Sequence, residues 1–295
     1  MSLERARTLI ALFLTLCLLT FAIACGGGDD DDDEEEGPAT STTTATKYAP
    51  SGNEGSISGT VAFQGTAPEA KPISMDADAA CGAANSNPMA EDVVVKDGKV
   101  QNVFVYVKDG KLDGNKTVDS FTFDPPAEAK VLDQKGCQYT PHIIGIQTGQ
   151  KLSVTNSDQT THNVNVQGNN NPKFNQSQTA GQAPIEKTFA RAETLIPVKC
   201  NQHPWMKSYV GVVKHPFYGV SGPDGRFEIK GLPAGTYTLV AWHERFGEKT
   251  QSVTVGAKES KQQDFSFAAG GTADSFSGGS LEVLPALELP MLGKH

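Results

Sequence analysis

The amino-acid sequence predicts an all-β protein made of two β-sandwiches. Short runs rich in β-branched residues recur along most of the chain, and each run is bounded by glycine or other turn residues. No segment shows a sustained helical stripe of apolar residues with capping residues at its ends. Roughly 210 residues of such strands are enough to build two small sandwiches, each with its own core.

The individual strands are expected in seven runs of residues: 55–65, 100–110, 150–158, 162–168, 208–214, 225–231 and 235–243. Alternation with a period of two supports the last two runs. Phe227 and Ile229 lie on one side of the first of them. Tyr237 and Leu239 lie on one side of the next, so each strand is expected to turn one face toward a core.

The stretch GVSGPDGRFEIKGLPAGTYTLVAWHERFGEKTQSVTVGA resembles the carboxypeptidase regulatory-like family, and the resemblance implies a transthyretin-like sandwich. Such domains usually open with a GTV-type strand, which residues 59–61 offer far upstream. We therefore expect a split sandwich that begins in residues 56–118 and ends in residues 215–268. A second sandwich over residues 119–214 then interrupts the first. The alternative is that the early strands belong to this middle domain.

The chain begins with a segment typical of secretion. Residues 1–24 consist of a basic head, MSLERART, and an uncharged apolar run, which together predict a signal peptide. The residues before Cys25 resemble the cleavage motif of bacterial lipoproteins, and the resemblance implies that Cys25 receives the lipid. The expected location is the bacterial cell envelope, in the periplasm or on the outer surface, with a lipid anchor in the membrane. The alternatives are an ordinary signal peptide or an uncleaved anchor.

Residues 25–55 are expected to form a solvated, disordered tether, because they are acidic, rich in small polar residues and have little to bury. The whole chain carries a net charge of −9. Residues 1–24 contribute +1 and the acidic run at 29–36 contributes −8, which leaves −2 for the remainder. A nearly neutral folded part has no basic field, so no nucleic-acid partner is expected. Residues 269–295 are expected to be a flexible tail.

The five cysteines suggest one disulfide and one single thiol. Cys17 leaves with the signal peptide and Cys25 is the lipid candidate, which leaves three thiols in an oxidising compartment. Because three is odd, at least one thiol stays unpaired or binds something else. Cys200 has neighbours of ligand type and is the better candidate for the single thiol, so Cys81 and Cys137 form the natural disulfide. The two other pairings stay open.

The run KCNQHPWM at 199–206 places Cys200, His203 and Met206 three residues apart. One interpretation is a short buried loop without chemistry, and the other is a set of ligands for one soft metal ion. A site made of two histidines, one cysteine and a long axial methionine suits copper that cycles between Cu(I) and Cu(II). This run supplies one of the two histidines. Zinc is the main rival, but it seldom accepts thioether sulfur, and its structural sites prefer more thiolates.

Two stretches resemble the cupredoxins, particularly the small blue copper proteins of the amicyanin, pseudoazurin and plastocyanin type. GIQTGQKLSVTNSDQTTHNVNV resembles the strand and loop before the first histidine ligand, and KCNQHPWMKSYVGVV resembles the C-terminal ligand loop. The resemblance implies a Greek-key sandwich that binds one copper ion through four residues: His162, Cys200, His203 and Met206. It also implies that Asn163 ties the two ligand loops together by hydrogen bonds.

The remaining histidines are assigned structural roles. His142 starts a strand whose far end leads to His162, so it is expected at the opposite end of the sandwich from the metal. His215 is placed at a domain junction and His243 in the regulatory-like domain. The sequence has no His-x-His pair, no G-x-S-x-G and no H-E-x-x-H, which favours an electron carrier or binding protein over an enzyme.

The sequence thus predicts a membrane-tethered, extracytoplasmic type 1 copper protein that carries single electrons between redox partner proteins. Pro204 and Trp205 are expected to form an apolar patch around an imidazole edge, which is a suitable electron port. One alternative is copper storage or delivery without electron transfer. Another is a structural or carbohydrate-binding surface protein in which the cupredoxin domain is only a scaffold. Fold alone does not separate these functions.

Overall fold

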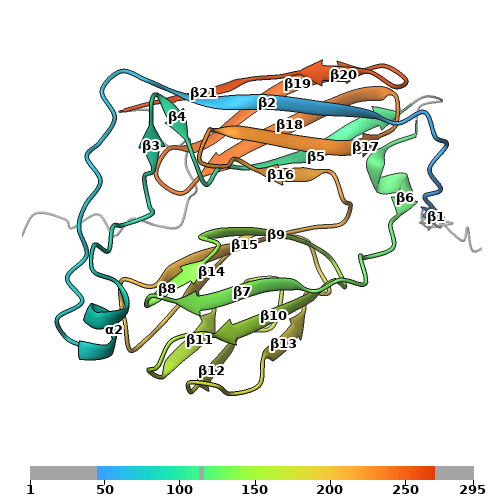
Figure 1. The fold of residues 1–295 in the computed structure, drawn as a ribbon. Coiled ribbons are helices and arrows are strands. Elements are labelled where there is room, and N and C mark those ends of the chain that lie inside the picture. The colour runs from blue at the N-terminus through green and yellow to red at the C-terminus, as the bar shows by residue number, and fades with distance from the viewer. Residues whose placement is uncertain (1–44, 113–115, 270–295) are drawn as a thin grey trace, which may run out of the picture. The chain divides into compact units, whose positions relative to one another are not determined.

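The computed structural model describes residues 45–112 and 116–269, which are nearly all β-structure (Figure 1). The prediction of an all-β fold with two sandwiches is confirmed. The expected signal peptide, Cys25, the acidic run and almost all of the expected tail lie outside the described residues. Among the described residues, no helix is long and apolar enough to cross a membrane.

The first sandwich is built from ten strands: β2 (Gly55–Gln64), β3 (Val95–Lys96), β4 (Lys99–Val100), β5 (Phe104–Leu112), β16 (Tyr218–Val220), β17 (Arg226–Leu232), β18 (Gly235–His243), β19 (Gly247–Val255), β20 (Ser260–Gln262) and β21 (Phe265–Ala268). One sheet has the order β16-β5-β18-β19. The other has the order β17-β2-β4-β3, and β20 and β21 also pair with β2. The strand β2 therefore pairs with strands from the far end of the chain.

The second sandwich is built from nine strands: β7 (Lys130–Lys135), β8 (Gln138–Thr140), β9 (Ile143–Gln147), β10 (Lys151–Asn156), β11 (His162–Val166), β12 (Phe174–Gln178), β13 (Ile185–Thr188), β14 (Glu193–Lys199) and β15 (Lys207–Val213). Its sheets have the orders β13-β10-β7-β8 and β12-β11-β14-β15-β9. The chain leaves the first sandwich after β5, builds the second one, and returns at β16.

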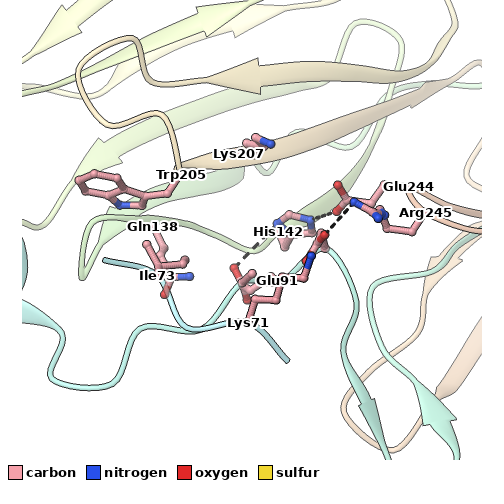
Figure 2. A pocket seen from close by; sticks show the side chains of 11 residues that line it. Lys71, Ile73, Glu91, Gln138, His142, Trp205, Lys207, Glu244 and Arg245 are labelled. Carbon is pink, nitrogen blue, oxygen red and sulfur yellow. Dashed lines mark hydrogen bonds and ion pairs between the residues drawn. The ribbon is translucent and has the colours of Figure 1, made fainter. Parts of the chain in front are cut away.

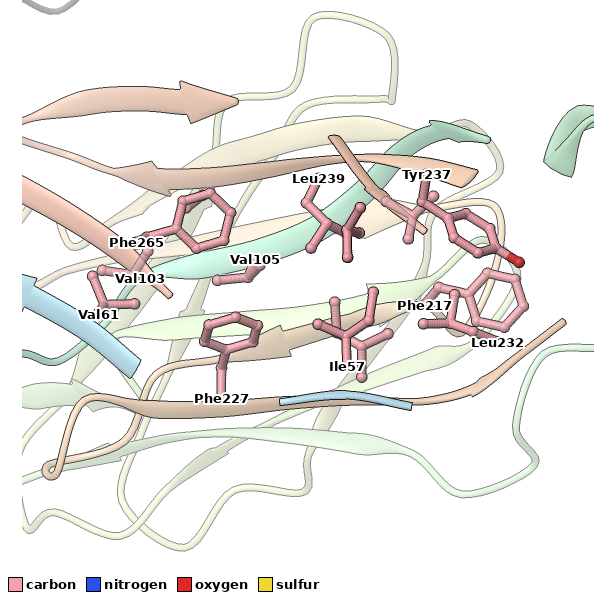
Figure 3. Close-up of a cluster of buried hydrophobic side chains, with 14 of the residues drawn as sticks. Ile57, Val61, Val103, Val105, Phe217, Phe227, Leu232, Tyr237, Leu239 and Phe265 are labelled. Carbon is pink, nitrogen blue, oxygen red and sulfur yellow. The ribbon is translucent and has the colours of Figure 1, made fainter. Parts of the chain in front are cut away.

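Alternating side chains fill the core of the first sandwich (Figure 3). Val105 and Val107 of β5 are at most 1% exposed. Tyr237 and Leu239 of β18 are equally buried in the same cluster. Since side chains two residues apart share a face of a strand, each strand lines the core with every second residue. Burial of each such side chain stabilises the fold by about 1.5–3 kcal/mol.

The opposite faces of β5 and β18 are buried as well, because they pack on the second sandwich. Phe104 of β5 and Val240 of β18 belong to a separate apolar cluster with residues of β9, β14 and β15. Two glycines make room for the ring of Phe104. A Cβ atom would come within 2.9 Å of this ring at Gly145 and within 2.7 Å at Gly211. The two sandwiches therefore share a packed junction inside one compact unit.

The expected tether, residues 25–55, extends into the described part of the chain, where residues 46–48 pack on the fold. The strand β1 (Thr46–Lys47) pairs in parallel with β6 (Phe121–Thr122). The ring of Tyr48 lies 5.7 Å from that of Phe121 and 5.1 Å from that of Phe123. A third ring, that of Phe217, lies 6.5 Å away. The low average hydrophobicity of this segment indicates solvation, but one aromatic side chain with three aromatic partners is enough to dock this part on the fold.

The segment between β2 and β3, residues 65–94, reaches from the first sandwich to the second, and we call it the cap segment. It contains the short helix α2 (Ala79–Ala84), whose first turn is capped by the carboxylate of Asp78. Cys81 of this helix forms a disulfide with Cys137 in the turn between β7 and β8. One further helical turn, η2 (Val118–Ser120), precedes β6. The cap segment is thus tied covalently to the second sandwich.

The buried His215 should make the protein sensitive to acid. Its Nε2 atom hydrogen-bonds to the carbonyl of Val107, and its Nδ1 atom accepts a hydrogen bond from the amide of Phe217. Burial lowers the pKa of this imidazole from 6.5 to about 4. The unfolded chain then binds the proton more readily between these pH values, so stability falls as pH falls. The loss should be about 3 kcal/mol.

The substitution His215→Gln tests this expectation, because glutamine keeps a donor and an acceptor but does not titrate. The free energy of unfolding is measured by urea denaturation between pH 6.5 and pH 4 for both proteins. The wild-type curve should fall more steeply than that of the variant. Parallel curves would show that His215 does not contribute to acid sensitivity.

Candidate metal centre

The second sandwich brings the four predicted ligand residues to one end. His162 is the first residue of β11, and Cys200 directly follows β14. These strands are antiparallel neighbours in one sheet, with Asn165 opposite Lys199. The start of one strand therefore lies beside the end of the other. His203 and Met206 lie on the turn that joins β14 to β15.

The ligand turn is short and held by its own backbone. The amide of Cys200 donates a hydrogen bond to the carbonyl of Met206 at 3.3 Å. The amide of Met206 donates to the carbonyl of His203 at 2.9 Å. The three residues are 3%, 1% and 4% exposed, in the order Cys200, Met206 and His203. The site is therefore shielded from water before any metal binds.

Three donor atoms converge in this space. One ligand atom each from His162, Cys200 and His203 lies within 4.8 Å of the others. The two Nδ1 atoms of the histidines are 2.9 Å apart. The Sγ atom of Cys200 is 3.7 Å from Nδ1 of His203. Among the described cysteines, Cys200 is the only one without a disulfide.

The far nitrogen of each histidine is bound to a carboxylate. The Nε2 atom of His162 lies 2.9 Å from Oδ2 of Asp158. The Nε2 atom of His203 lies 3.0 Å from Oδ2 of Asp78 in the cap segment. A carboxylate accepts hydrogen bonds, so it favours the tautomer in which Nε2 carries the proton. The Nδ1 atoms are then unprotonated, and each has a lone pair that can bind a metal ion.

This arrangement fits a metal cation. In the tautomers that the two carboxylates favour, the Nδ1 lone pairs of His162 and His203 point at one another across 2.9 Å. Two acceptors face to face repel each other unless a proton or a metal ion lies between them. A thiolate beside two imidazoles and a buried thioether forms a soft donor set, which suits copper better than zinc.

Asn163 connects the two ligand loops. Its side-chain oxygen accepts a hydrogen bond from the amide of Asn201 at 2.6 Å. It also lies 3.4 Å from Sγ of Cys200, and the backbone amide of Asn163 lies 3.5 Å from the same sulfur. Asn163, which follows His162, thus holds Asn201, which follows Cys200. Backbone and side-chain contacts to the sulfur also limit its movement.

The electrostatics of the site favour a charged histidine beside a thiolate. Burial opposes protonation of His162, but the hydrogen bonds to Asp158 and Cys200 outweigh it and raise the pKa to about 9. Burial likewise opposes the thiolate of Cys200, but the hydrogen bond from His162 and nearby amides lower its pKa to about 6. The thiol is therefore prepared for metal binding, which requires the thiolate.

One disulfide positions both carboxylates. Asp158 accepts hydrogen bonds from the amides of Gly136 and Cys137 at 2.6 and 2.8 Å. Asp78 accepts hydrogen bonds from the amide of Cys81 at 3.3 Å and, through Oδ2, from the hydroxyl of Thr160 at 3.0 Å. The bond between Cys81 and Cys137 therefore joins the backbone groups that hold the two aspartates.

The imidazole edge of His203 does not lie in an open apolar patch, which differs from the expectation for the electron port. The cap segment covers it, since Asp78 binds its Nε2 atom and His203 is only 4% exposed. The ring of Trp205 packs beside it with 5.1 Å between ring centroids. The indole nitrogen of Trp205 donates to the carbonyl of Cys137 at 3.0 Å. Trp205 is the more accessible of the two rings.

The predicted position of His142 is wrong. The amide of Tyr209 donates to the carbonyl of His142, and Tyr209 stands two residues after Lys207, where β15 begins at the ligand turn. His142 and Trp205 also line one cavity. The chain reverses near Gly149 between β9 and β10, so the end of β10 returns to the pole where β9 began. The number of residues between His142 and His162 suggests one strand that crosses the sandwich, but the reversal brings both residues to the same end.

Two functional candidates, Asp78 and Asp158, were missed in the sequence. Asp158 stands four residues before His162 in the polar loop NSDQTTH. Asp78 stands three residues before Cys81. A polar loop before a ligand histidine could have indicated Asp158. No local pattern indicates Asp78, because its contact with His203 spans 125 residues.

The comparison with protein families finds one match. Residues 212–268 match the model of the carboxypeptidase regulatory-like domain. This region covers the strands β16 to β21 of the first sandwich and only the last two residues of β15. A comparison with curated proteins gives no significant match.

Solved copper proteins show partial similarity. A copper-containing nitrite reductase from Thermus scotoductus SA-01 is 19% identical, with a TM-score of 0.28. The alignment covers 30% of this chain and 25% of the reductase, so this chain spans only a quarter of the reductase. A methionine-to-alanine mutant of amicyanin, in the Cu(I) form, is 22% identical over 30% of this chain and 86% of its own, with a TM-score of 0.26. A purple cupredoxin from Nitrosopumilus maritimus is 26% identical, with a TM-score of 0.23. The alignment covers 26% of this chain and 82% of the cupredoxin.

Replacing Asp158 by asparagine should raise the pKa of the Cys200 thiol in the metal-free protein. Asp158 raises the pKa of His162, and the protonated imidazole lowers that of Cys200. Without the carboxylate, thiolate should form well above pH 6, closer to the ordinary pKa of 9. The thiolate ultraviolet absorbance, measured against pH, reports this change.

The matched control is Asp133→Asn, because Asp133 binds Thr155 and Ser157 and touches neither histidine. Its thiolate titration should superimpose on that of the wild type. If Asp158→Asn also leaves the curve in place, the link from Asp158 through His162 to Cys200 is absent.

Proposed function

We propose that this chain is a type 1 copper protein of the cupredoxin kind that carries single electrons between redox partner proteins. The observation that carries the proposal is the convergence of two imidazole Nδ1 atoms and one thiol in a buried space, beside a methionine on the same turn. The motif C-x-x-H-x-x-M and the upstream histidine supply the same four residues in sequence. When bound, copper supplies reversible one-electron chemistry.

The ligands of the proposed copper ion are four: His162, Cys200, His203 and Met206. The protein's part is to hold these donor atoms in place in both charge states of the ion. Asp158 and Asp78 fix the two imidazole rings, and Asn163 fixes the loop that carries the thiolate. Such supporting hydrogen bonds orient ligands and keep the tautomer that leaves Nδ1 unprotonated.

The closed site favours the electron carrier over a copper delivery protein. A delivery site must open so that a partner's ligands can replace its own. Here Asp78 closes the site over His203, and the disulfide of Cys81 and Cys137 holds the cap segment in place. Because the disulfide ties the cap segment to the second sandwich, release of the metal would also require the cap segment to move away from His203. The closed site supports a resident ion and an electron carrier rather than an enzyme.

The proposed location is the bacterial cell envelope, with the chain anchored through a lipid on Cys25. The apolar run before Cys25 and the disulfide between Cys81 and Cys137 both support an extracytoplasmic, oxidising compartment. An acidic run follows Cys25 and would repel an anionic membrane surface. A tethered carrier of this kind meets membrane-bound redox partners.

The absorption spectrum of the purified protein loaded with Cu(II) tests the function. We expect an intense blue colour from charge transfer between the thiolate of Cys200 and the metal. The substitution Cys200→Ser should abolish the colour. The substitution Met206→Leu should shift the reduction potential and keep the colour, because the axial thioether is a weak ligand that tunes the potential.

A suitable control is Ser208→Ala, since Ser208 lies beside the ligand turn and its hydroxyl binds only the carbonyl of Pro141. This variant should keep both colour and potential. A colourless protein that retains zinc after gentle purification would refute the copper electron carrier.

The substitution Cys25→Ser tests the anchor in a bacterial host. The wild-type protein should partition into the detergent phase and incorporate labelled palmitate, because two or three acyl chains give stable membrane attachment. The variant should be released in soluble form, with the metal centre and its colour unchanged. A variant that stays in the membrane would instead identify the apolar N-terminal segment as the anchor.

A further inference from the structure

A second cluster of buried polar side chains lies outside the metal centre (Figure 2). It lines a cavity of about 200 Å³, formed by the cap segment, the end of the second sandwich and the turn after β18. His142 stands at its centre and is only 6% exposed. The sequence pattern assigned this histidine a structural role, and the proposed electron transfer does not use it.

The imidazole of His142 lies between two carboxylates. Its Nε2 atom hydrogen-bonds to one oxygen of Glu244. The other oxygen of Glu244 accepts a hydrogen bond from the hydroxyl of Tyr209 at 3.2 Å. On the other side, Nδ1 of His142 is 3.8 Å from Oε2 of Glu91, which is too far for a hydrogen bond. Glu244 is fully engaged, whereas His142 Nδ1 and Glu91 have no hydrogen-bond partner among the described residues.

The two carboxyl groups have opposite environments. Burial raises the pKa of Glu91; the nearby His142 opposes this effect and Glu244 adds to it, and the net shift is upward. Burial also acts on Glu244, but the hydrogen bond from His142 outweighs it and lowers the pKa. Neighbouring acids whose pKa values are driven apart are typical of sites that bind or transfer protons.

The remaining walls offer a flat apolar surface and two cations. The ring of Trp205 and the side chain of Ile73 line one part of the cavity. Lys71 and Lys207 line it as well, and neither forms an ion pair within residues 45–112 and 116–269. The guanidinium of Arg245 is paired with a carboxylate of the cap segment. The two ammonium groups are thus the cations available to a ligand.

These walls define the chemistry of an occupant. The Nδ1 atom of His142 and the carboxyl group of Glu91 are free to hydrogen-bond a ligand, and a hydroxyl can bond to both, because it donates one hydrogen bond and also accepts. The ammonium groups of Lys71 and Lys207 require an anionic acceptor and repel a second cation, so the donor is a neutral hydroxyl. The face of Trp205 suits an aromatic ring. A cavity of about 200 Å³ limits the ligand to a single small ring.

We propose that this cavity binds a small hydroxyaromatic carboxylate. The hydroxyl bridges Nδ1 of His142 and the carboxyl group of Glu91, donating its one proton to one of them and accepting a hydrogen bond from the other. The ring packs on Trp205, and the carboxylate lies near Lys71 and Lys207. The cavity shares only the ring of Trp205 with the surroundings of the metal centre, where this ring packs on that of His203. Binding does not require the metal, and it places an aromatic molecule one indole ring away from a proposed copper ligand.

Titration of the metal-free protein with 4-hydroxybenzoate tests the site by calorimetry and by the amide and indole NMR spectrum. We expect saturable binding, with shifts at the indole signal of Trp205, and weaker binding of benzoate, which lacks the hydroxyl. His142→Phe should weaken 4-hydroxybenzoate about tenfold and leave benzoate nearly unchanged, because phenylalanine cannot form the buried hydrogen bond to the hydroxyl. Lys71→Met should weaken both ligands.

The control is Lys96→Met, because Lys96 is exposed on β3 and does not line the cavity; it should bind both ligands like the wild type. If His142→Phe fails to fold, Glu91→Met removes the other hydrogen-bonding group for the hydroxyl, at a more exposed position. The site is refuted by absence of saturation, or by equal binding of 4-hydroxybenzoate and benzoate. The metal-free assay keeps the two proposals apart: a blue protein that binds neither ligand refutes only the cavity, and a colourless protein that binds refutes only copper.

Discussion

The candidate metal centre depends on two hydrogen bonds between imidazole Nε2 atoms and aspartate carboxylates. Asp158 and Asp78 bind the far sides of His162 and His203, so both near nitrogens face the thiol of Cys200. A hydrogen bond to a charged group contributes about 1.5–3 kcal/mol, and losing it here would also free a ring to rotate. The disulfide between Cys81 and Cys137 adds a covalent constraint, because the backbone of each cysteine holds one of the aspartates.

This arrangement gives the first sandwich a part in the metal centre. The cap segment leaves that sandwich after β2 and returns to it at β3, and between these strands it supplies Asp78 to His203. The sandwich fixes both ends of the cap, and the disulfide fixes its middle. The chain order, in which the second sandwich interrupts the first, keeps both close through the junction around Phe104. Without the cap segment, the second sandwich would not supply the carboxylate that binds Nε2 of His203.

The sequence predicted what local patterns encode. Alternation predicted strands such as β17 and β18, and the spacing of Cys200, His203 and Met206 predicted a single turn at one pole. The contact between Asp78 and His203 could not be predicted, because it depends on the path of the cap segment across both sandwiches. The error at His142 has a similar origin. A reversal between two strands decides which pole a residue occupies, and residue count alone does not show it.

The two aspartates also affect the proposed redox chemistry. Burial of a carboxylate beside a histidine is costly unless positive charge is near, and lowered pKa values keep both aspartates ionised. In the metal-free site the proton on His162 supplies that charge. With copper bound as proposed, the ion takes over this role, and Cu(II) interacts more favourably with two carboxylates than Cu(I) does. In the proposed copper site, the cap segment and Asp158 would therefore favour the oxidised form and lower the reduction potential relative to a site with neutral partners at both Nε2 atoms.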